Sequence, residues 1–328
     1  MDWSFKKRDL RAVTLLCFQE IKKYLKKKRF SEVTNNVVLY QKINFNHVNI
    51  MKTKSILIIV FMLLISKSVF SQTAFKVNVK GKGDPVLLFP GFGCPGEIWN
   101  ETVAELSKNY ECHIFTFAGF GNVPPIENPW LSTIKNEVIS YVKTNKIKNA
   151  TLIGHSLGGT LSLWLASTET DLFKKVILVD ALPATAALMI PNYKGDVIPY
   201  DSPQSKMMLA MNQNAFDAMN SQSISYMCLN KEKQKTISEW MKIADRKTYV
   251  YGYIDMLNLD LRKEIAKIKI PVVILAATNP DLNTVQKTYK TQYENLPSVK
   301  IYYAANSAHF VMYDQPDWFM EKVKSEMQ

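Results

Sequence analysis

One serine lies in a setting that is typical of an enzyme nucleophile. Ser156 stands at the centre of Gly-His-Ser-Leu-Gly-Gly (residues 154–159), between the apolar runs 150–153 and 157–167. A strand that turns sharply into a helix lifts such a hydroxyl above the sheet edge, and the glycines let the two elements approach closely. The helix N-terminus also stabilises negative charge that develops nearby. We therefore predict that Ser156 is a nucleophile; the alternative is a serine that merely caps a helix.

A serine hydroxyl needs a base, and the chain contains only four histidines. His47 lies in a basic leader, His113 falls within a predicted strand before the serine motif, and the side chain of His155 should diverge from its neighbour Ser156. His309 follows the last predicted strand, and parallel strands end at one edge of a sheet. Elimination therefore favours His309 as the base, the alternative being a histidine of a surface loop.

The third member of such a set is an acid between the serine and the histidine in the chain. Asp281 comes soon after the apolar run 272–276, and Asp180 ends the run 176–179. Either carboxylate could hold the imidazole in its useful tautomer. We predict Asp281, with Asp180 as the alternative; an Asp at a strand end is otherwise often a helix cap.

Two backbone N–H groups are needed to stabilise the oxyanion of an acyl-transfer reaction. The residue after the nucleophile, Leu157, supplies one of them. The loop Pro-Gly-Phe-Gly at residues 90–93 follows an apolar strand, and its glycines permit a close backbone approach. We predict the amide of Phe92 as the second donor; the alternative is a plain Pro-Gly turn.

Strands that alternate with helices position these residues. We expect strands at residues 75–79, 86–89, 113–117, 151–153, 176–179, 272–276 and 301–303. We expect helices at residues 97–109, 131–146, 157–167 and from about 318 onward. This pattern predicts an α/β fold with a mostly parallel sheet and helices on both faces.

The alternation is interrupted at residues 182–265, where the sequence is helical in character. This insertion contains eight methionines and the tyrosines 249, 251 and 253. Because methionine surfaces adapt to varied ligands, the insertion could form an apolar roof over the site. The equal alternative is that these side chains fill the core of a helical cap.

From about residue 75 to the C-terminus, the chain resembles the α/β-hydrolase superfamily, the serine esterases and lipases in particular. Residues 90–93 are similar to its oxyanion loop, residues 118–121 (Ala-Gly-Phe-Gly) to its Gly-x-Gly turn, and residues 154–159 to its nucleophile elbow. His309-Phe310 followed by residues 314–316 (Asp-Gln-Pro) is similar to its base-bearing loop. Two positions depart from the pattern, because Pro90 replaces a histidine and Thr278 replaces a glycine before the acid.

The resemblance implies an eight-stranded type of sheet, a helical cap at about 182–265, and ester cleavage through an acyl-enzyme on Ser156. It implies a small-molecule substrate and no cofactor, and the Met-rich, aromatic insertion suggests that this substrate carries an apolar acyl or alcohol group. Amidases, peptidases, C–C bond hydrolases and acyltransferases share this arrangement and remain alternatives. A protein that kept the fold as a non-catalytic binding module is the alternative from a different class.

The charge is concentrated before residue 72. Of the net charge of +12, residues 1–50 contribute +7, residues 51–71 contribute +3 and residues 72–328 only +2. Because residues 72–328 are nearly neutral, they produce no broad positive electrostatic field that would attract phosphates. We therefore expect no nucleic-acid partner. The three cysteines after residue 71 are Cys94, Cys112 and Cys228; without Cys-x-x-Cys spacing they indicate neither a metal site nor a redox motif.

Residues 51–71 have the layout of a secretory signal peptide. Two lysines lead into ten apolar residues, and small residues precede Gln72. The apolar run is too short for a comfortable membrane span, so we expect a secreted or periplasmic protein without a stable anchor. A signal anchor or a buried helix is the alternative. Because signal peptides begin a chain, we interpret Met51 as the initiator and residues 1–50 as a mis-assigned extension, the rival being an amphipathic basic helix.

Overall fold

The computed structural model describes residues 73–191 and 193–328. The two segments at 1–50 and 51–71, for which we predicted an extension and a signal peptide, lie outside the described residues. These two predictions therefore continue to rest on the sequence. Within the described residues, no helix is both long enough and apolar enough to cross a membrane.

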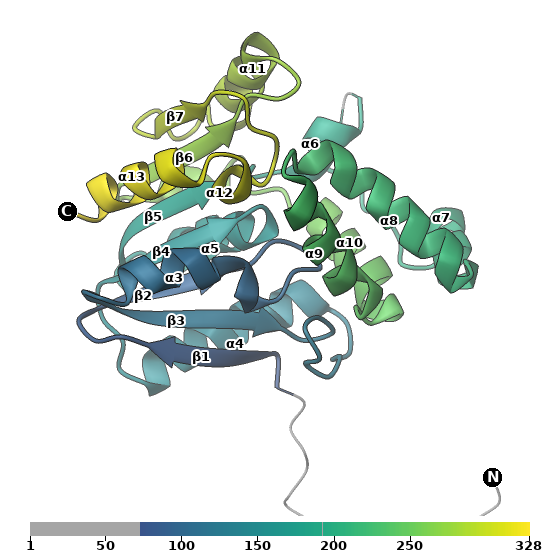
Figure 1. Cartoon of the computed structure of the whole chain (residues 1–328), viewed down its shortest axis with the longest axis horizontal. Coiled ribbons are helices and arrows are strands. Elements are labelled where there is room, and N and C mark those ends of the chain that lie inside the picture. Colours follow the sequence, from purple (N-terminus) through teal and green to yellow (C-terminus); the bar gives the residue numbers. More distant parts are fainter. Residues whose placement is uncertain (1–72, 192) are drawn as a thin grey trace, which may run out of the picture. The chain divides into compact units, whose positions relative to one another are not determined.

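A single twisted sheet of seven strands forms the centre of the described chain. Its strands follow the order β1-β3-β2-β4-β5-β6-β7, and β1 alone runs antiparallel to its neighbour (Figure 1). The strands are β1 (Phe75–Lys80), β2 (Asp84–Phe89), β3 (Tyr110–Phe117), β4 (Ala150–His155), β5 (Phe173–Val179), β6 (Val272–Ala277) and β7 (Lys300–Ala304). Each strand predicted from the sequence is present. The described residues thus hold seven strands rather than eight.

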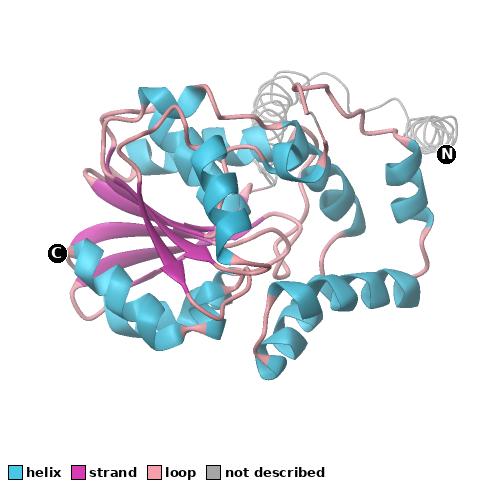
Figure 2. Cartoon of the chain, turned by 90° about the horizontal axis from the view of Figure 1, so that it is seen from above, coloured by secondary structure: helices cyan, strands magenta, loops and turns pink. Residues whose placement is uncertain are grey.

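Alternate residues of the inner strands serve two separate hydrophobic cores. In β2, Leu87 and Phe89 pack into one core, whereas Val86 and Leu88 pack into the other. The first core is covered by α4 (Trp130–Thr144), α5 (Leu157–Thr168) and α11 (Leu282–Gln292). The second is covered by η1 (Gly96–Trp99), α3 (Asn100–Leu106), α12 (Val311–Asp314) and α13 (Pro316–Met327). Helices therefore lie on both faces of the sheet, which confirms the predicted architecture (Figure 2).

Between β5 and β6 the chain leaves the sheet and forms helices. They are α6 (Thr185–Met189), α7 (Pro203–Ala210), α8 (Gln213–Met227), α9 (Lys231–Lys242) and α10 (Arg246–Asn258), followed by the short η2 (Glu264–Lys267). Side-chain caps fix where several of them begin: Asn212 accepts a hydrogen bond from Ala215 N, and Asp245 accepts one from Thr248 N. These five helices lie beyond the carboxyl edge of the sheet (Figure 1).

Candidate active site

Ser156 occupies a sharp turn between β4 and α5. Its backbone is left-handed, with φ of 52°, a conformation that a residue with a side chain adopts only when its surroundings enforce it. Its N–H donates to Val179 O at 2.9 Å, and its carbonyl accepts from Thr160 N at 3.0 Å. The Ser156 hydroxyl forms no capping bond to the helix it precedes, so the capping interpretation has no support.

The glycines on either side of Ser156 are required by close packing. A Cβ atom at Gly154 would lie 2.2 Å from Gly158 O, and one at Gly158 would lie 2.3 Å from Phe89 O. Side chains at either position would therefore push α5 away from β4 and β2. The local sequence thus holds the turn, and with it Ser156, against the carboxyl edge of the sheet.

His309 contacts a carboxylate from the end of β5. Its Nδ1 lies 2.6 Å from Asp180 Oδ2, and both side chains are mostly buried. Since a carboxylate only accepts, Nδ1 carries the proton, which leaves Nε2 of the neutral imidazole as an acceptor. This is the tautomer that a general base for a hydroxyl requires.

The structure brings Asp180, and not the predicted Asp281, to His309. Asp281 is exposed and caps α11, where its Oδ1 accepts from Thr284 N at 2.9 Å. Its pKa is lowered by the hydrogen bonds from Thr284, as expected for a carboxylate at a helix N-terminus. The helical periodicity that begins directly after Asp281 was the available sign that this side chain would serve as a cap.

Asp180 receives three hydrogen bonds from the described residues. Besides His309, its Oδ1 accepts from Ala277 N at 3.0 Å and from the Tyr289 hydroxyl at 2.9 Å. Burial by itself would raise the pKa of this carboxyl group, but the bonds from His309, Ala277 and Tyr289 outweigh burial, and the pKa is lowered. Asp180 is therefore held as a carboxylate. Sequence reasoning missed Tyr289 because no local motif marks it.

His155 is buried beside His309. Its ring centre lies 4.7 Å from that of His309, and its Nε2 donates to His309 O at 3.0 Å. Burial, reinforced by the neighbouring His309, lowers the pKa of His155 to about 3, so this ring stays neutral. His113 lies away from this group and contacts Tyr141 and Glu111 instead.

The loop predicted to stabilise an oxyanion lies against Ser156. A Cβ atom at Gly91 would approach Ser156 Cβ to 3.4 Å and His155 Nδ1 to 2.5 Å. The loop is closed by a bond from Cys94 N to Gly91 O at 3.1 Å. Within the described chain, no acceptor engages the N–H of Phe92 or of Leu157. Both amides thus remain candidate donors to a ligand.

Aromatic side chains join this loop to the cap. The Phe92 ring lies 5.1 Å from Tyr249 and 5.7 Å from Tyr253, both on α10, and 5.2 Å from Phe120. Gly93, with φ of 75°, faces the Met241 side chain so closely that a Cβ there would lie 2.3 Å from its sulfur. The surroundings of the loop are therefore aromatic and apolar.

The methionines of the insertion divide between the two expected settings. Met241 and Met256 are buried, whereas Met189 and Met207 are more than half exposed.

A second link to the cap runs through Asp314, whose carboxylate accepts from Ala308 N, beside His309, and from Leu229 N, both at 2.8 Å. The loop that carries His309 is thus fixed to the junction of α8 and α9.

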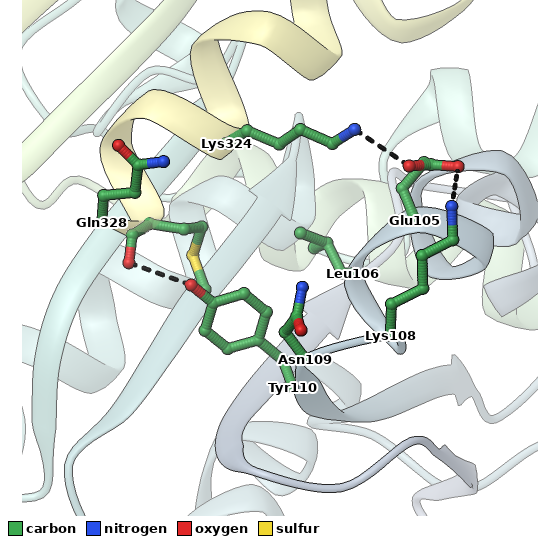
Figure 3. A pocket seen from close by; sticks show the side chains of 8 residues that line it. Glu105, Leu106, Lys108, Asn109, Tyr110, Lys324 and Gln328 are labelled. Carbon is green, nitrogen blue, oxygen red and sulfur yellow. Dashed lines mark hydrogen bonds and ion pairs between the residues drawn. The ribbon is translucent and has the colours of Figure 1, made fainter.

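A cavity of about 340 Å³ lies elsewhere, at the amino ends of the parallel strands (Figure 3). Glu105 pairs there with Lys108 and Lys324, and the Tyr110 hydroxyl donates to Met327 O. None of the candidate catalytic residues lines this cavity.

The described residues contain no group of three or more His, Cys, Asp or Glu side chains arranged to hold a metal ion.

Comparison with known proteins gives consistent matches. A family model described as "Alpha/beta hydrolase family" matches residues 86–322. The pimeloyl-[acyl-carrier protein] methyl ester esterase of Vibrio atlanticus is 22% identical over 260 residues, which cover 76% of this chain and 96% of that protein. The enol-lactonase of Burkholderia xenovorans superposes with a TM-score of 0.64 at 17% identity, over 76% of this chain and 95% of the other. An esterase from Exiguobacterium antarcticum superposes with a TM-score of 0.65 at 18% identity, over 77% and 94%.

Proposed function

Because this chain belongs to the alpha/beta hydrolase family, we propose that it is a serine hydrolase that cleaves carboxylic esters through Ser156, His309 and Asp180. The observation that carries this proposal is the 2.6 Å contact between His309 Nδ1 and Asp180 Oδ2. That contact leaves Nε2 free to accept a proton, at the sheet edge where Ser156 sits in its left-handed turn.

The reaction proceeds in two acyl transfers. His309 Nε2 takes the Ser156 proton as the hydroxyl oxygen attacks the ester carbonyl, and the resulting oxyanion is bound by the amides of Phe92 and Leu157. The intermediate then collapses, the C–O bond to the alcohol breaks, and His309 returns the proton to the leaving oxygen. Water, activated in turn by His309, releases the acid from Ser156. Asp180 stabilises the imidazolium in both steps.

One observation supports an apolar group in the substrate, and a second supports an ester as the bond that is cleaved. The loop next to Ser156 carries Phe92 and packs against Tyr249, Tyr253 and Met241. These side chains favour an apolar acyl or alcohol group over a charged one. The relatives at 22–26% identity carry the name of a methyl ester esterase. Amide, peptide and C–C bond cleavage are the alternatives that use the same residues.

A fluorophosphonate probe tests the nucleophile directly. We expect the wild-type protein to be labelled and the Ser156→Ala variant to remain unlabelled, because the probe traps an activated serine as a covalent adduct. Hydrolysis of aryl esters should fall about a millionfold in Ser156→Ala, the order of loss typical when a serine nucleophile is removed. A wild type that is never labelled would contradict the hydrolase and favour a binding protein, whereas labelling that persists in Ser156→Ala would contradict Ser156 as the nucleophile.

We also propose that the protein is exported, with the mature chain beginning at Gln72. Support comes from the basic start, apolar run and small residues of 51–71, which follow the three-part layout of a signal peptide. N-terminal sequencing of the protein recovered from a periplasmic or medium fraction should give Gln72 as the first residue. A mature chain that begins at Met1 would contradict both this proposal and the interpretation of Met51 as the initiator.

A further inference from the structure

We infer that the hydroxyl of Tyr289 is a positioning group for the candidate acid: it orients the Asp180 carboxylate toward His309. This inference rests on the proposed function, since it concerns the same Ser156–His309–Asp180 site. Tyr289 lies on α11, and its described side-chain hydrogen bond is to Asp180 rather than to Ser156 or His309. Its effect on the reaction is therefore exerted through Asp180.

The geometry fixes which oxygen of Asp180 faces His309. Oδ1 is occupied by Ala277 N at 3.0 Å and by the Tyr289 hydroxyl at 2.9 Å, so Oδ2 is left for His309 Nδ1. Asp180 itself has a left-handed backbone, with φ of 45°, at the point where β5 ends. Two donors on a single oxygen restrict rotation of the carboxylate, which a lone backbone amide does not.

The phenol ring is held rigidly enough to serve this purpose. Tyr289 is 4% exposed and stacks on Tyr293, with ring centres 5.9 Å apart and planes 16° from parallel. Tyr293 is also buried, and its hydroxyl donates to Ala181 O at 2.8 Å. Burial raises the pKa of the Tyr289 hydroxyl well above its usual value, so this group remains a donor.

The helix that carries Tyr289 begins at the Asp281 cap. Asp281 stands where the family pattern places its acid, yet it fixes the start of α11, the helix that presents Tyr289 to Asp180. The first buried residue of α11 is Val285, and Tyr289 follows four residues later on the same face. The segment after β6 thus contributes a donor to the acid in place of the acid itself.

The Tyr289→Phe variant tests the inference, with Tyr293→Phe as the matched control. Each substitution removes one buried hydroxyl, the first from α11 and the second from the residue that follows it, but only the first removes a bond to Asp180. The first readout needs no substrate: the proton between His309 Nδ1 and Asp180 Oδ2 should give a far-downfield ¹H NMR resonance, assigned by its loss in Asp180→Asn. A carboxylate with one donor fewer attracts this proton more strongly, so the resonance should move downfield in Tyr289→Phe and stay in place in Tyr293→Phe.

Kinetics provide the second readout. We expect kcat for aryl esters to fall about tenfold in Tyr289→Phe with little change in KM, because the lost bond acts on the reacting group and not on substrate binding. The acid limb of the kcat/KM profile should move to higher pH, since the His309–Asp180 pair then binds a proton more tightly. The other titratable groups around this pair are His155 at the end of β4, Tyr293 directly after α11, and Tyr303 on β7 beside Tyr289.

An unmoved resonance and an unchanged kcat in Tyr289→Phe, or equal changes in Tyr293→Phe, would overturn the inference. Should Tyr289→Phe not fold, 3-fluorotyrosine at position 289, a stronger donor of nearly the same size, should move the resonance upfield, and no movement would again overturn it. If Ser156→Ala retains esterase activity, the proposed function fails, whereas the NMR comparison still decides whether Tyr289 acts on Asp180.

Discussion

At the scale of single residues, two aspartates are candidates for the acid that orients His309, and their surroundings distinguish them. Asp180 is mostly buried and accepts bonds from His309, Ala277 and Tyr289, whereas Asp281 is exposed and accepts from the first turn of α11. Both side chains follow strands of the same sheet. Only the carboxylate that is enclosed with the imidazole can orient it and stabilise its charged form.

Substitution of each aspartate should therefore have unequal effects. We expect Asp180→Asn to lower kcat about a thousandfold or more, because the amide keeps the shape but favours the wrong imidazole tautomer. Asp281→Ala should leave kcat close to the wild-type value and lower the unfolding temperature slightly, since a cap is lost. Steady-state hydrolysis of an aryl ester, with thermal unfolding of all three proteins, checks both statements. Full activity in Asp180→Asn with loss in Asp281→Ala would restore the original choice of acid.

At the scale of elements, the sequence predicted most of the scaffold. Strands β2, β4 and β6 are buried on both faces, so their continuous apolar runs were sufficient to locate them. The helix expected at 97–109 is shorter, because η1 and α3 end at Leu106 and the chain then turns into β3. The bounds of the helices within the insertion had no such marker, because they depend on side-chain capping bonds and on tertiary contacts.

The site was predictable only where local sequence determines geometry. The turn at Ser156 follows from neighbouring glycines, and His309 was reached by elimination among four histidines. The partner of His309 is 129 positions away in the chain, and the choice between two strand-end aspartates depends on how the loop at 307–310 folds. Thr278 N and Asn279 N both donate to Ser307 O, and these bonds fix this loop. No sequence pattern predicts them.

At the scale of the whole molecule, the candidate site lies where the two hydrophobic cores meet the cap. His155 ends β4, the central strand, and its ring contacts both His309 and Phe310. Asp314 fixes the same loop to the cap through Leu229 N. A change in the charge or position of His155 would therefore act directly on His309 and Phe310.

The pH dependence of stability should report on this burial. The pKa of His155 is about 3 in the folded protein, against 6.5 for a free histidine, so the unfolded chain binds more protons between these values. The contribution of the neutral His155 to the free energy of unfolding is fully present above about pH 6.5. It decreases as the pH drops, and at pH 5 the free energy of unfolding should be lower by about 2 kcal/mol. The lowered pKa of Asp180 adds a loss in the same direction only below about pH 4, outside this window. Urea unfolding at pH 7.5 and pH 5 should therefore show the loss in the wild type and a smaller one in His155→Gln, which retains a donor for His309 O; equal losses in the two proteins would show that His155 is not held neutral.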